Sequence, residues 1–145
     1  MGILADLFVS TPEEAIAYEA AIGTAQIEKR YERAEYKGLT GLEFGTLWAI
    51  LEGKEWDVDK HMLEEIHFGP DGETWLMKFP AELIGLLISA DAAKTEAALN
   101  SWAQTEELQM NGVTLEDVRP IFTDLVRLAN IANTEQESLY LWGSL

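Results

Sequence analysis

The stretch from residue 40 to residue 53, TGLEFGTLWAILEG, constrains the fold most, because it carries the clearest helix signals in the chain. Thr40 and Glu43 have capping-box spacing, in which each side chain accepts a backbone N–H at the start of the helix. Large apolar residues then recur on one helical face, namely Phe44, Leu47, Trp48 and Leu51. Gly53 is a typical C-terminal stop. Burial of each large apolar side chain is worth about 1.5–3 kcal/mol, so we expect this helix to seed a core.

Strand patterns are found at both ends of the chain and around a turn in the middle. Residues 3–9 (ILADLFV) and 138–142 (SLYLW) are short apolar runs, and chain ends often lie close together, so we expect these two strands to pair. Residues 69–72 (GPDG) are a strong turn signal, and residues 74–79 alternate after it, which predicts a hairpin. Residues 31–36 can be read as strand or helix, and their alternation favours a short strand.

Four further segments have helical patterns: residues 12–22, 81–90, 92–108 and a last one that follows Thr114. In the last one, Pro120 predicts either a kink or a short turn before a helix that begins near Arg119. Residues 62–65 are read as a turn of helix. Residues 1–145 are therefore predicted to form a single α+β domain, with one small mixed sheet and about five helices packed on it.

The charge of the chain limits its partners. The sequence has 145 residues with 26 acidic and 10 basic ones, and its net charge is −16. Phosphate contacts need clustered Lys and Arg, so direct binding to nucleic acid or to an anionic membrane is not expected. An acidic surface favours solubility and a basic protein partner. Four basic residues do cluster within nine positions, at Lys29, Arg30, Arg33 and Lys37, where they either pair with nearby acids or form an anion pocket.

The sequence predicts a cytoplasmic protein. It has no cysteine, and its N-terminal segment lacks the basic residues of a signal peptide. The longest uncharged apolar run, residues 83–90, is far too short to cross a membrane. No cofactor motif is found, and the oligomeric state is left open.

One segment has chemical character. Asp57, Asp59, His61 and His67 lie within eleven positions and include both histidines of the chain. Carboxylates and imidazoles together suit Zn, Mn or Fe, so these residues form a candidate metal site of a metal-assisted hydrolase. Their spacing matches neither HExxH nor an EF-hand loop, and Lys60 would oppose a cation. The alternative interpretation is an acidic surface loop.

Three of the five tryptophans are candidate binding residues: Trp48, Trp56 and Trp75. Tryptophan is enriched at interfaces, although most tryptophans are largely buried in cores. A pocket around Trp48 and Trp75 would suit a small-molecule sensor.

In its order of elements the chain resembles a family of small uncharacterised bacterial α+β proteins with an N-terminal strand, a central Trp-containing helix that ends in Gly, and a hydrophobic C-terminal strand. Trp48, Leu51, Gly53 and residues 139–142 carry the resemblance. It implies the same fold and assigns no active site.

Acidity without a catalytic motif favours a non-enzymatic binding protein, a regulator or inhibitor of a basic protein partner. The alternatives are the metal-assisted hydrolase centred on Asp57 to His67 and the small-molecule sensor.

Overall fold

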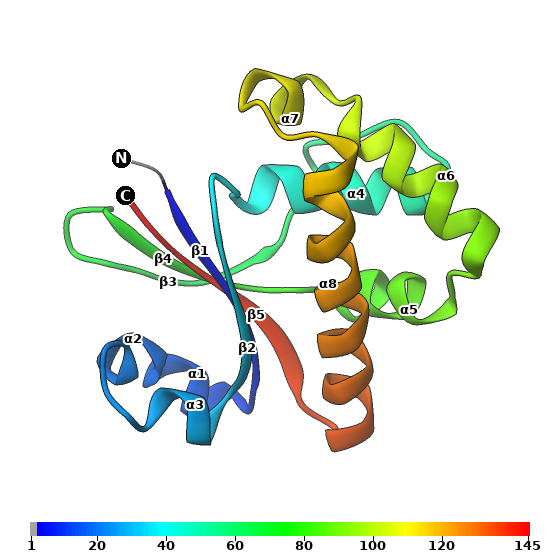
Figure 1. Ribbon diagram of the computed structural model, residues 1–145. Helices are drawn as coiled ribbons and strands as arrows, with labels where there is room; N and C mark the ends of the chain where they lie inside the picture. Colours follow the sequence, from blue (N-terminus) through cyan, green and yellow to red (C-terminus); the bar gives the residue numbers. More distant parts are fainter. Residues whose placement is uncertain (1–2) are drawn as a thin grey trace.

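The computed structural model describes residues 3–145 and has an α+β fold with one open antiparallel sheet (Figure 1). The strands lie in the order β2-β1-β5-β4-β3. Their bounds are Leu4–Ser10 for β1, Glu32–Lys37 for β2, Glu64–Phe68 for β3, Thr74–Lys78 for β4 and Ser138–Ser144 for β5. The expected pairing of the terminal strands is confirmed, because β1 pairs with β5 along its whole length.

Residues 3–145 form eight helices. Their bounds are Pro12–Ile16 for α1, Tyr18–Ala21 for α2, Ile27–Arg30 for α3, Gly41–Glu52 for α4, Ala81–Ser89 for α5, Ala92–Ala103 for α6, Glu106–Met110 for α7 and Leu115–Glu135 for α8. The helix α4 confirms the strongest sequence pattern: Thr40 and Glu43 form the capping box, and Gly53 ends the helix with φ 72°.

The prediction of a mixed sheet was wrong, because every pair of neighbouring strands runs antiparallel. The helix count was too low because two predicted helices are divided and α3 is additional. The first divides at Ala17 into α1 and α2. The second divides before Thr105, whose extended backbone and hydroxyl bond to the Trp102 carbonyl separate α6 from α7.

Three local predictions have different outcomes. The strand expected over residues 31–36 is confirmed as β2. The helical turn expected at residues 62–65 was wrong, because Glu64 starts β3 and pairs with Lys78 across the hairpin. Of the two alternatives for Pro120, the later start near Arg119 was wrong, because α8 begins at Leu115, where Thr114 and Asp117 form a capping box, and continues through Pro120.

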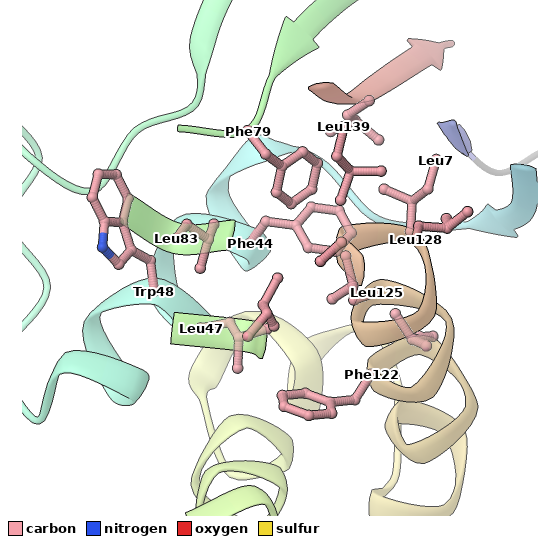
Figure 2. Packing of buried hydrophobic residues seen from close by; sticks show 14 of the residues in the cluster. Leu7, Phe44, Leu47, Trp48, Phe79, Leu83, Phe122, Leu125, Leu128 and Leu139 are labelled. Atoms are coloured by element: carbon pink, nitrogen blue, oxygen red, sulfur yellow. The ribbon is translucent and has the colours of Figure 1, made fainter. Parts of the chain in front are cut away.

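The two faces of the sheet carry separate cores (Figure 1). On one face, α8 packs on alternate residues of β1 and β5, such as Leu7 and Leu141, and α4, α5 and α6 complete this core around α8. Figure 2 shows the centre of this core, where Phe44 and Phe79 lie near Leu125 of α8. On the other face, α1–α3 cover a cluster in which Phe8 stacks on Tyr18 with ring centroids 3.9 Å apart.

None of the helices described in residues 3–145 combines the length and the apolar character needed to cross a membrane.

Candidate functional site

An apolar groove opens where the β3–β4 hairpin faces the start of α4 and the connecting segment, which we define as residues 53–63 between α4 and β3. Its volume is about 390 Å³. Its lining includes five large apolar side chains that are exposed, here called the groove residues: Leu42, Trp56, Val58, Met62 and Phe68. Single exposed hydrophobic residues are normal on a protein surface, but a contiguous group marks a site of interaction.

The hairpin supplies one side of the groove. Phe68 of β3 lies opposite Trp75 of β4, and alternation places Met77 on the same face as Trp75. Trp75 and Met77 line the groove, whereas Leu76 belongs to the core on the other face of the sheet. Trp75 lies directly over Gly143 of β5, where a Cβ would come within 2.0 Å of the indole Nε1. The indole can lie flat on the sheet because position 143 has no side chain.

The connecting segment supplies the opposite side, and His61 fixes it to α4. The Nε2 of His61 lies 2.7 Å from Glu52 Oε1, and its Nδ1 accepts the Asp57 backbone N–H at 2.9 Å. His61 is buried, and its ring meets that of Trp48 edge-on with centroids 5.2 Å apart. An Nδ1 that accepts a hydrogen bond carries no proton, so the ring is the tautomer that donates from Nε2 to the Glu52 carboxylate.

The same carboxylate also binds Lys60, whose Nζ lies 2.7 Å from Glu52 Oε2. The hydrogen bonds from His61 and Lys60 lower the pKa of Glu52 to about 2. Lys60 thus serves the attachment of its own segment to α4 and adds little positive charge to the groove.

The acidic residues of the connecting segment shape a turn. The Asp57 carboxylate accepts the Asp59 N–H at 2.9 Å, and the Asp57 carbonyl accepts the N–H groups of Lys60 and His61. This pattern is an Asx turn, in which aspartate replaces a backbone acceptor. It turns Val58, which lies between two aspartates, into the groove.

The structure does not gather the four candidate metal ligands. Both ring nitrogens of His61 are already bonded, Asp57 bonds within its own turn, and His67 lies exposed on β3 opposite Leu76. Among residues 3–145, no three His, Cys, Asp or Glu side chains are placed to hold a metal ion.

Two of the three candidate tryptophans meet in the groove. Trp56 and Trp75 both line it, whereas Trp48 is buried behind His61. The indole N–H groups of Trp48 and Trp75 are buried and have no partner among the described residues. Sequence reasoning missed the other four groove residues, Leu42, Val58, Met62 and Phe68, as site residues. A signal for them was present in the sequence, because each is a large apolar residue where a polar one is expected. Leu42 lies outside the core stripe of α4, and the others lie in polar segments.

Carboxylates are frequent in the two segments that form the walls of the groove. Residues 54–73 contain seven acidic residues and two lysines, and every one of these acids is exposed. Within residues 3–145, none of the seven forms an ion pair. We call them the acidic rim: Glu55, Asp57, Asp59, Glu64, Glu65, Asp71 and Glu73.

The basic cluster of the sequence lies elsewhere, and its two arginines, Arg30 and Arg33, form ion pairs. The Arg33 side chain is only 7% exposed and bonds to Asp6, Glu28 and Glu35, and its Nε donates to the Tyr18 hydroxyl at 2.8 Å. Tyr18 donates to Asp6 Oδ2 at 2.6 Å. Burial is the main cause that raises the pKa of the Tyr18 phenol, and this hydrogen bond raises it further. These contacts favour the pairing interpretation over the anion pocket, because the guanidinium is occupied on all sides.

Comparison of the chain with protein-family models, with curated proteins and with solved structures finds no match. The resemblance to small bacterial α+β proteins stays a prediction.

Proposed function

We propose that this chain is a non-enzymatic binding protein that regulates or inhibits a basic protein partner, and that the groove receives a segment of that partner. The observation that carries the proposal is the conjunction of five exposed apolar side chains with an unpaired acidic rim. Apolar anchors surrounded by a charged border are the usual anatomy of a protein interface.

Charge defines the chemistry of the partner. Seven exposed carboxylates without ion pairs, in the segments that form an apolar groove, select a partner segment with large apolar residues flanked by Lys or Arg. They repel nucleic acid and other acidic chains, and they accelerate the approach of a basic one. The net charge of −16 extends the same field over the rest of the molecule.

The test is a parallel capture experiment in which a native cell lysate is passed over three immobilised proteins. These are the wild type, the Trp56→Ser/Phe68→Ser variant and the Met110→Ser variant. Met110 is an exposed hydrophobic residue on α7, outside the groove lining, and serves as the matched control. We expect the wild type and the control to retain the same basic protein at low salt and to release it at high salt, because salt screens exposed charges. The groove variant should retain none of it.

Equal retention by the groove variant and the wild type would refute the groove as the site. Absence of any specific protein on the wild type would refute the binding function itself.

A second candidate function is the binding of a small apolar molecule, and the size of the groove favours it. A volume of about 390 Å³ lies within the range of small-molecule sites, and the walls of the groove are mainly apolar side chains. Titration with the neutral dye Nile red tests it. Saturable binding that is insensitive to salt and lost in Trp75→Ala supports a small-molecule site, and binding that persists in this variant excludes it.

A further inference from the structure

We infer that the partner segment binds as an added strand along β3. This inference rests on the proposed function and specifies the conformation and residue pattern of the partner. It predicts an extended segment whose apolar side chains enter the groove from the open edge of the sheet.

The open edge at β3 is the first supporting observation. The strand is the last in the sheet order, it pairs with β4, and all five of its residues are exposed. The opposite edge strand, β2, is flanked by α8: the Tyr36 hydroxyl bonds to the Pro120 carbonyl and to Asp124, and Arg127 lies 3.6 Å from Glu32. The two edges of one sheet therefore differ, because two side chains of β2 contact α8 and half of its residues are partly buried, whereas every residue of β3 is exposed.

The second supporting observation is which residue pairs of the hairpin are hydrogen-bonded to each other. Gly69 N–H donates to the Thr74 carbonyl at 2.9 Å, so Gly69 and Thr74 form a hydrogen-bonded pair. Pairs in an antiparallel ladder alternate, and the next pair, Phe68 and Trp75, is thus the non-bonded kind. The backbone N–H and C=O of Phe68 then point away from β4, toward the open edge, and can bond to an incoming chain.

The side chains of β3 define the pattern of the partner. Phe68 shares the groove face with Trp75, while His67 lies on the other face with Leu76. A strand beside β3 places every second side chain on the face of the sheet that Phe68 and the groove occupy. Glu64 and Glu65 favour basic residues at the start of β3 and repel a second copy of the same edge, which limits self-association. The preferred segment alternates apolar with basic residues.

The test compares two synthetic peptides of identical composition, both acetylated and amidated. In the first, Lys alternates with Val or Leu; in the second, the apolar residues have helical spacing. We expect the first to bind the wild-type protein about tenfold more tightly or better, measured by calorimetry at low salt. In hydrogen exchange followed by mass spectrometry, the bound peptide should slow exchange in β3 and leave β2 unchanged.

Two variants at one position separate backbone pairing from side-chain contact. Phe68→Ala removes the ring, and Phe68→Pro removes the ring together with the outward N–H. Added-strand binding predicts that the proline variant binds the alternating peptide several-fold more weakly than the alanine variant. Circular dichroism checks that both variants fold. If the proline variant does not fold, the hydrogen-exchange experiment on the wild type decides whether the peptide binds as an added strand.

Tighter binding of the helical-spacing peptide, with β3 exchange unchanged, would refute strand addition and leave the proposed function in place. Binding of neither peptide, together with an empty capture on the wild type, would refute both.

Discussion

Glu52 attaches the connecting segment to α4 through a single carboxylate. It accepts from His61 and Lys60, which lowers its pKa from the ordinary 4.5 to about 2. A carboxyl whose pKa is lower in the folded chain stabilises the fold above its unfolded pKa. That contribution disappears as the pH falls through the folded pKa.

We therefore expect protonation of Glu52 to contribute to the stability that the wild type loses between about pH 4.5 and pH 2. The Glu52→Gln variant should lose less stability over this range, because it has no carboxyl group to protonate at this position. Urea unfolding at a series of pH values measures it. Glu55→Gln is the matched control, an exposed carboxylate without an ion pair, and its profile should follow the wild type. Parallel profiles for the wild type and Glu52→Gln would contradict the prediction.

Gly45 allows the connecting segment to lie against α4. A Cβ at this position would come within 2.1 Å of the His61 carbonyl oxygen, which is backbone and cannot rotate away. We expect Gly45→Ala to lower the free energy of unfolding by about 1–3 kcal/mol. Gly85→Ala on α5 is the control, because no heavy atom lies within 4 Å of its Cβ position. It should instead stabilise the protein by about 0.5–1 kcal/mol, measured by urea unfolding. Equal effects of the two substitutions would refute the close approach.

At the level of residues, the sequence predicted two members of the groove, Trp56 and Trp75, from residue type alone. It could not predict that His61 is buried and bonded at both nitrogens. That arrangement depends on Glu52, nine positions earlier, which the capped helix α4 brings into reach.

Among the elements, α8 contains an internal proline that its caps and packing tolerate. Pro120 lies six positions after the Thr114 cap, is exposed, and has no N–H to offer the Glu116 carbonyl. We expect Pro120→Ala to stabilise the protein by about 1–3 kcal/mol, after the small loss from a freer unfolded chain. Thermal and urea unfolding test this, and a lower melting temperature for the variant would contradict it.

Thr114→Ala, which removes the cap of α8, should lower the free energy of unfolding by about 1 kcal/mol.

Elements with strong local signals were predicted well, and elements set by pairing were not. The helix α4 and the β3–β4 hairpin follow from a capping box and a Gly-Pro-Asp-Gly turn. The strand β3 was only partly expected, because residues 62–65 have no local strand signal and pair through the hairpin. The direction of each strand depends on its partners across the sheet, which no local pattern encodes.

For the whole molecule, the net charge of −16 opposes compaction, because folding brings like charges together. We expect the melting temperature to rise with NaCl over the first few hundred millimolar as the repulsion is screened. The partner binding proposed for the groove should weaken over the same range. A melting temperature that falls or stays constant with NaCl would show that the paired charges dominate the exposed ones.

The strand β5 joins two parts of the sheet that have no other connection within it. The β1–β2 pair lies on one side of β5 and the β3–β4 pair on the other. Two-stranded ribbons are marginal in water by themselves. During synthesis on the ribosome, both ribbons leave the exit tunnel before β5 does. The groove hairpin therefore gains its neighbouring strand only after β5, which follows it by about sixty residues, has been made, and until then the nascent chain carries the binding surface on an unsupported two-stranded ribbon.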